Sequence, residues 1–129
     1  MATWNQVTEL LKSQYPIEKE GSDFLMINFA TIGTRTQRVL IGVDKHPQLG
    51  EWINIASPIG TIPAGTLDQA LLAVGNLPVG GLVKFEDTHF LRDTMLLATI
   101  TPEELNIVLA LITTLADGLE ATLVGGDTH

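Results

Sequence analysis

Apolar side chains recur at the three- and four-residue spacing of an amphipathic helix in three stretches, residues 4–14, 67–75 and 102–123. The inward positions of the first two stretches are Trp4, Val7, Leu10 and Leu11, followed by Leu67, Ala70, Leu71 and Val74. Leu72 points away from the second stripe. The pattern therefore predicts three helices, of which the first two each bury one narrow face.

The same capping signal precedes each of these stretches. A threonine is followed three residues later by a glutamine or a glutamate, at Thr3/Gln6, Thr66/Gln69 and Thr101/Glu104. In such a capping box the threonine oxygen accepts from the third backbone amide, and the third side chain reaches back to the cap. We therefore expect the helices to begin at residues 4, 67 and 102.

Five runs between the predicted helices have the apolar content of β-strands. They read DFLMINFAT, QRVLIGVD, EWINIAS, GLVKF and HFLRDTMLLAT. The first run is apolar on both faces, which is typical of a central strand that is covered on each side. PIGTIPAG, residues 58–65, is rich in proline and glycine and is expected to be a loop. The order α-β-β-β-α-β-β-α predicts an antiparallel sheet and one α+β domain over residues 1–129.

The third helix carries more apolar surface than one buried stripe needs. Its inward stripe is Leu105, Val108, Leu109, Ile112, Leu115, Ala116, Leu119 and Leu123, and its wet face is Asn106, Thr113, Asp117 and Glu120. Ile107 and Leu111 lie on neither, with Gly118 further along their flank. Either loops or the first helix cover this flank, or it is a subunit or ligand contact in which Gly118 lets another backbone approach. Leu72 contributes to the same contact surface or to a different one.

The composition strengthens the expectation of an interaction surface. Hydrophobic residues make up 45% of the 129-residue chain and charged residues 17%, which excludes a disordered protein. A small domain hides that much apolar surface with difficulty, so we expect a second copy or a binding face.

The charge of the chain limits its possible partners. The net charge is −8, and the seven cations form no cluster, which disfavours nucleic acid and anionic membranes as partners. No secretory signal is visible and the apolar run 105–116 is short for a membrane span, so we expect a cytoplasmic protein.

No arrangement of residues points to catalysis, so we expect a protein that is not an enzyme and holds no cofactor. The chain has no cysteine, which excludes thiolate chemistry. Asp44, His46 and Glu51 could form a weak metal trio, although a solvated turn is the better explanation. Arg35 and Arg38 could clamp an anion, but two cations on a hairpin are usually solvated.

One segment carries a resemblance to a known family. It reads ALLAVGNLPVGGLVKFEDTHFLRDTMLLATITPEELNIVLALITTLADGLEATL: a leucine-rich short helix, an asparagine, a glycine-led strand, an acidic turn, a second strand and a long helix. This order resembles the C-terminal half of the type III secretion chaperone-like superfamily, including its YbjN-type branch. The opening WNQVTELLKSQ and the three strands after it are also similar. The resemblance thus spans nearly the whole chain, through element order and apolar pattern.

The resemblance implies a compact fold with a strongly bent antiparallel sheet, commonly a homodimer in the cytoplasm. Members of the superfamily hold an extended stretch of a client protein on apolar patches. Their second helix often forms much of the dimer contact, and here that helix would use Leu72 and Ala73. The residue pattern alone favours Ile107, Leu111 and Gly118 instead.

We therefore expect a non-enzymatic, chaperone-like or adaptor domain that forms a homodimer and holds a client segment. In a client groove, Ile53 and Ile55 would be the strand residues and Trp52 an anchor, with burial in the core as the alternative for each. The second hypothesis is a regulatory or structural domain whose only tight partner is itself. A metal- or small-molecule-binding protein built on the Asp44 trio is a distant third.

Overall fold

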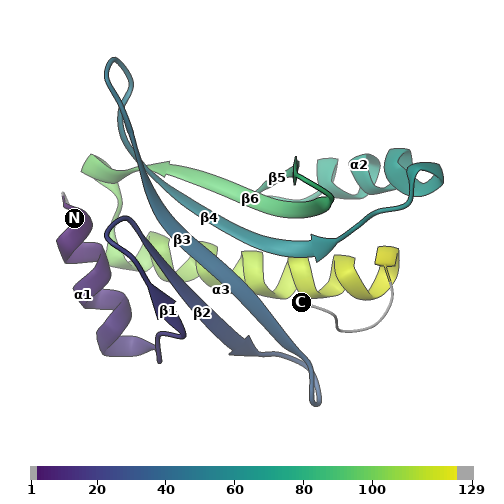
Figure 1. Cartoon of the computed structure of the whole chain (residues 1–129), viewed down its shortest axis with the longest axis horizontal. Helices are drawn as coiled ribbons and strands as arrows, with labels where there is room; N and C mark the ends of the chain where they lie inside the picture. The colour runs from purple at the N-terminus through teal and green to yellow at the C-terminus, as the bar shows by residue number, and fades with distance from the viewer. Residues whose placement is uncertain (1–2, 125–129) are drawn as a thin grey trace.

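The computed structural model describes residues 3–124 and confirms the α+β class, with a six-stranded antiparallel sheet and three α-helices (Figure 1). The helices are α1 (Trp4–Gln14), α2 (Leu67–Gly75) and α3 (Pro102–Leu119), the last continued by a π-helical turn over Glu120–Val124. The strands are β1 (Lys19–Glu20), β2 (Phe24–Ala30), β3 (Thr36–His46), β4 (Gly50–Gly60), β5 (Gly81–Phe85) and β6 (Thr88–Leu96). The predicted order of elements holds, with the two-residue β1 as an addition.

The strands are ordered β1-β2-β3-β4-β6-β5, and every neighbouring pair is antiparallel. Leu40 on β3 lies opposite Met26 on β2 and Ala56 on β4, so these three side chains share one face. Ile41, opposite Ile55, belongs to the other face. Because side chains alternate along a strand, the even-numbered residues of β2, β3 and β4 line one face and the odd-numbered residues the other.

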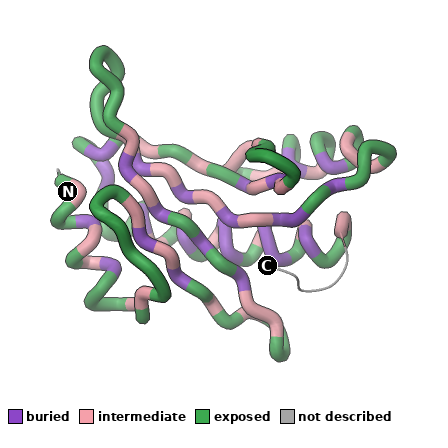
Figure 2. The backbone as a smooth tube through the Cα atoms, in the orientation of Figure 1, coloured by how far each residue is buried: buried purple, intermediate pink, exposed green. Residues whose placement is uncertain are grey.

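The hydrophobic core lies on the odd-numbered face. α3 packs across β3, β4 and β6, and α1 contributes Val7 and Leu11 to the same core. The largest fully buried side chains are Leu11, Leu25, Ile27, Ile41, Ile53, Ile55, Ile59, Leu91, Leu97, Ile100, Leu105 and Leu109. Figure 1 shows α3 behind the sheet, and Figure 2 shows buried and more exposed positions alternating along the strands in front of it. One face of the sheet therefore supplies the core.

The capping prediction is correct at Thr3 and Thr101. Each threonine oxygen accepts from the backbone N–H three residues later, at 3.2 and 3.1 Å, and Thr3 completes a capping box with Gln6. The prediction is wrong at Thr66, whose hydroxyl donates to the carbonyl oxygen of Pro63 at 3.0 Å. A 3-10 turn over Ala64–Thr66 leads directly into α2, so Thr66 already belongs to a helical turn. Its side chain makes no capping hydrogen bond.

The predicted loop over residues 58–65 is wrong in its first part, because β4 continues to Gly60. Pro58 lies opposite Phe90 of β6, and the register shifts between Pro58 and Gly60. Proline lacks an N–H donor, so a strand tolerates it where a bulge already interrupts the regular pairing. Gly60 has a φ of +112°, a backbone conformation that residues with a side chain rarely adopt.

β2 is not the central strand that its apolar residues predict. It lies second from the edge of the sheet, and β1 pairs only with Leu25 and Met26. The odd-numbered Leu25 and Ile27 are buried, whereas Phe24 and Met26 on the other face stay partly exposed. The central positions belong to β3 and β4, so one apolar face of β2 remains accessible.

The exposed side of α3 differs from the predicted wet face. Thr113, Asp117 and Glu120 are buried, and Asn106 alone of the four predicted residues is partly exposed. Asp117 Oδ1 accepts from Arg35 Nε at 3.1 Å, and Glu120 Oε1 lies 4.0 Å from Arg35 Nη2. Arg35 belongs to the turn between β2 and β3, so the pattern within the helix cannot reveal this partner. The residues that face solvent include Ile107, Ala110, Thr114 and Gly118.

Candidate functional site

The even-numbered face of β2, β3 and β4 is open to solvent. In Figure 1 this face is turned to the viewer, and no helix of the described residues lies over it. Phe24 and Met26 are partly exposed there, and Leu40 is 38% exposed. Antiparallel sheets commonly leave one face solvated, but that face is then mostly polar. A solvated face with large apolar side chains is typical of a surface that binds a partner.

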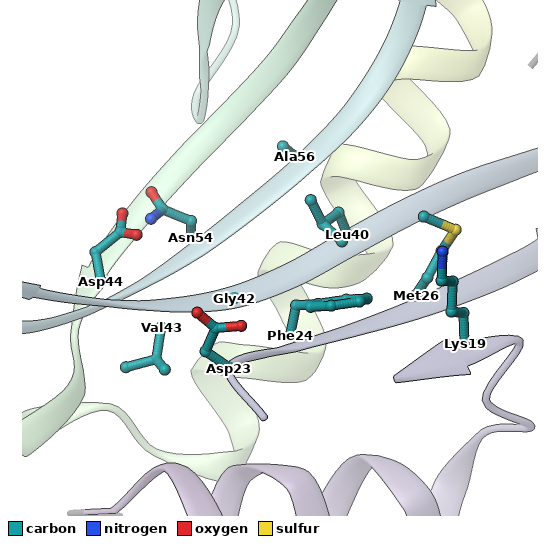
Figure 3. Close-up of a pocket in the computed structure, with 10 residues that line it drawn as sticks. All are labelled: Lys19, Asp23, Phe24, Met26, Leu40, Gly42, Val43, Asp44, Asn54 and Ala56. Atoms are coloured by element: carbon teal, nitrogen blue, oxygen red, sulfur yellow. The ribbon is translucent and has the colours of Figure 1, made fainter. Parts of the chain in front are cut away.

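These side chains line an open groove of about 410 Å³ that crosses β2, β3 and β4 (Figure 3). Its apolar lining includes Phe24, Met26, Leu40 and Ala56. Gly42 has no side chain, so the backbone of β3 forms the floor beside Phe24. Because the groove is open, an extended chain segment fits it better than a small molecule that needs enclosure.

Charged residues mark the two ends of this groove. Asp23 and Asp44 lie around Gly42 at one end, and Lys19 lies at the other end beside Met26 (Figure 3). Asp44 also borders two further hollows, of about 230 and 490 Å³. The groove is therefore acidic at one end and basic at the other, and it shares Asp44 with two neighbouring depressions, which Arg92 and Lys45 also line.

Of the two carboxylates at the acidic end, Asp44 has one long, exposed ion pair and Asp23 has no ion-pair partner among the described residues. Arg92 Nη2 lies 3.8 Å from Asp44 Oδ2, while its Nε and Nη2 donate to Asn54 Oδ1 at 2.9 and 2.6 Å. Among residues 3–124, no cation lies within ion-pair distance of Asp23. An exposed pair as long as that of Asp44 contributes little free energy. Both carboxylates thus keep most of their attraction for the positive charge of a partner.

Of the predicted client-binding residues, only Trp52 lies on the open face. Its indole N–H donates to the carbonyl oxygen of Leu49 at 2.8 Å, and Trp52 lines the hollow next to the groove. Ile53 and Ile55 are 0% exposed, because the odd-numbered positions of β4 face α3. Their assignment to a client surface is therefore wrong, and the alternative of core burial is correct.

Phe24, Met26 and Leu40 are surface residues that the sequence interpretation missed. The signal was present, since β2 carries the apolar Phe24 and Met26 at even positions as well as apolar residues at the odd ones, and Leu40 shares a face with the charged Arg38. Alternation shows which residues share a face but not which face the helices cover. The packing of α3 decides that question.

α2 presents two adjacent leucines to solvent. Leu72 is 72% exposed, as expected, and Ala73 is partly buried. Leu71 was expected to point inward, but it is 51% exposed, because only Ala70 and Val74 of this short helix reach the core. The surface of α2 is therefore more apolar than the sequence pattern indicates.

The other predicted contact surface, on the flank of α3, is also accessible. Ile107 is 52% exposed, Gly118 is exposed and Leu111 is partly buried. A Cβ added at Gly118 would meet no atom within 4 Å. The flank has room for another chain, although one large exposed side chain gives less apolar area than a stable interface needs.

The possible metal trio is not assembled. Asp44 and His46 share the open face, but Glu51 lies opposite Lys45 and points to the other face of the sheet. Within residues 3–124, no group of three or more Asp, Glu or His side chains could hold a metal ion. The metal hypothesis is therefore contradicted for this trio.

The two arginines do not form an anion clamp. Arg35 pairs with the buried Asp117 at 3.1 Å, and Arg38 forms a separate, exposed ion pair with Glu18. The expectation that both arginine side chains are solvated thus holds for Arg38 and is wrong for Arg35.

His89 is buried, and its Nδ1 accepts from the backbone N–H of Ile62 at 3.1 Å, which makes it a hydrogen-bonded core residue.

No protein-family model matches the sequence, and no curated protein is significantly similar to it. Within residues 3–124 one helical stretch, Pro102–Val124, is long and apolar enough to cross a membrane, with a mean hydropathy of 1.8. The core helix of a soluble protein passes the same test, and Leu105, Leu109 and Ile112 of this stretch are buried in the core. The fold and the open groove are thus the observations from which a function can be proposed.

Proposed function

We propose that the chain is a non-enzymatic protein-binding domain, chaperone-like or adaptor in character. It forms a homodimer in the cytoplasm and holds a segment of a client protein on the open sheet face. The observation that carries this proposal is the apolar groove around Leu40, on a face that no described helix covers. The resemblance to secretion chaperones supports it, since those proteins hold client segments on apolar patches.

The groove suits an extended segment. Such a segment presents alternate side chains to one face at a spacing of about 6.6 Å, so successive side chains reach the groove and the adjoining hollow at Trp52. Burying one leucine-sized side chain stabilises a complex by about 1.5–3 kcal/mol. Since association costs at least about 4 kcal/mol, several side chains must dock together.

The homodimer is proposed to use α2 and not the groove. Leu71 and Leu72 are consecutive residues of this helix, and each has more than half of its surface in solvent. Burying these leucines in both copies would contribute roughly 4–8 kcal/mol before the costs of association. The flank of α3 around Ile107 is the alternative contact.

Light scattering tests the dimer. The wild-type chain should have twice the mass of one chain, and Leu72→Glu should reduce it to the single-chain mass. Asn5→Glu is the matched control, because it adds a charge at an exposed position of α1, which neither proposed contact includes, and should leave the dimer intact. If Leu111→Glu alone separates the copies, the contact lies on α3. A single-chain mass for the wild type at every concentration contradicts the dimer.

Affinity capture from a cell extract tests the client-binding role. The wild-type chain should retain a stoichiometric client, and Leu40→Glu should lose it while the variant stays folded, since Leu40 is on the surface. Asn28→Glu is the matched control, because Asn28 is exposed on the same face of the sheet but outside the groove. An intact dimer that retains no client would instead support the second hypothesis, a regulatory or structural domain that binds only itself.

A further inference from the structure

We infer that the open groove selects client segments in which a lysine or arginine accompanies an apolar side chain, the cation docking between Asp23 and Asp44. This inference rests on the proposed function and specifies the chemistry of the client. It follows from two features of one groove: the apolar floor around Leu40 and the pair of carboxylates at one end (Figure 3).

The geometry of β3 sets the spacing of the two client side chains. Leu40 and Asp44 lie on the same face, four residues apart, which corresponds to about 13 Å along the strand. Asp23 reaches the same end from the segment before β2, where its carbonyl oxygen accepts from Val43 N–H at 3.0 Å. A lysine or arginine side chain is itself several ångströms long, so the cation belongs two to four positions from the apolar residue of an extended segment.

The charges around the groove favour one orientation of the segment. Lys19, at the far end beside Met26, repels a cation there, while Asp23 and Asp44 attract it. Asp44 is only weakly paired, since the guanidinium of Arg92 is held by Asn54. The net charge of −8 also draws basic segments toward the protein and disfavours acidic ones.

The expected contribution of the carboxylates is moderate. An ion pair at a partly exposed site changes affinity by a factor of about 1.5 to 5, so removing both carboxylates should weaken binding about three- to tenfold. At an ionic strength of about 0.5 M the Debye length falls to about 4 Å, and salt should weaken binding to a similar extent.

The test begins with a phage-displayed library of random twelve-residue peptides. The library is panned on the wild-type chain, after depletion on Leu40→Glu to remove peptides that bind elsewhere. Fluorescein-labelled copies of the selected peptides are then titrated with three proteins, and binding is followed by fluorescence anisotropy. The proteins are the wild type, the groove variant Asp23→Asn/Asp44→Asn and the variant Asp68→Asn/Glu103→Gln. The last variant is the control, because it removes the same charge from exposed positions on α2 and α3.

We expect the selected peptides to be enriched in lysine and arginine two to four positions from an apolar residue. Their affinity should fall three- to tenfold in the groove variant and remain unchanged in the control. Peptides without this enrichment, or with equal losses in both variants, overturn the inference and leave the protein-binding function standing. A selection that yields no Leu40-dependent peptide contradicts both. If Leu40→Glu separates the two copies of a dimer, a second copy occupies the groove, and this also overturns the inference.

Discussion

Replacing Arg35 by methionine should remove the cation that holds the turn between β2 and β3 against the C-terminal part of α3. Arg35 Nε donates to Asp117 Oδ1 and Arg35 Nη2 to the carbonyl oxygen of Asp117, both at 3.1 Å. Glu120 Oε1 lies 4.0 Å from the same guanidinium. The side chains of Asp117 and Glu120 are 7% and 0% exposed, so both carboxylates depend on contacts within the protein.

The magnitude follows from this burial. Removing one partner of a buried ion pair typically costs about 3–5 kcal/mol, because the remaining charge stays buried without compensation. Water reaches part of the Arg35 side chain, which is 25% exposed, so we expect the lower end, about 3 kcal/mol. Arg38→Met is the matched control, since its pair with Glu18 is exposed on both sides and should contribute about 1 kcal/mol or less.

Urea denaturation followed by circular dichroism measures both losses as shifts in the free energy of unfolding. A further variant, Arg35→Met/Asp117→Asn/Glu120→Gln, should recover part of the lost stability, because it leaves no charge buried. If Arg35→Met loses no more stability than Arg38→Met, the buried network does not stabilise the fold and the reasoning from burial is refuted.

Two further predictions use the same denaturation measurement. Thr3→Ala should cost about 1 kcal/mol and Thr66→Ala less than about 0.5 kcal/mol, because only Thr3 caps its helix; the reverse order would contradict the capping geometry. Gly80→Ala should cost about 1–3 kcal/mol, since φ is +89° and the new Cβ would lie 3.0 Å from Leu91 Cδ1. Gly118 lies inside a helix with open space around it, so Gly118→Ala should instead stabilise the chain by up to about 1 kcal/mol. Equal losses of stability for Gly80→Ala and Gly118→Ala would contradict this difference.

The helices and strands of this protein are predictable because their signals act over a few residues. Thr3 and Thr101 mark helix starts that the structure keeps, since a cap needs only the next turn of backbone. The local signals fail where a neighbouring segment changes the outcome. Pro58 indicated a loop, but pairing with β6 keeps it in a strand at a bulge.

The buried side of α3 and the candidate site were less predictable, because both depend on contacts between distant segments. Asp117 and Glu120 have the spacing of surface residues, and only the fold brings Arg35 to them. Leu40 and Ile55 both belong to alternating apolar strands, yet one lines the open groove and the other is in the core. The difference arises from the side on which α3 packs, which no single strand encodes.

Site-specific photo-crosslinking in cells that express the chain tests most directly whether the uncovered sheet face engages another protein. A photoreactive amino acid replaces Leu40 in the groove or, as a control, Ala110 on the solvent side of α3. We expect position 40, and not position 110, to crosslink to a defined segment of a different protein, identified by mass spectrometry. Crosslinks from position 110 alone, or from position 40 only to a second copy of the chain, would contradict a client-binding role for this face.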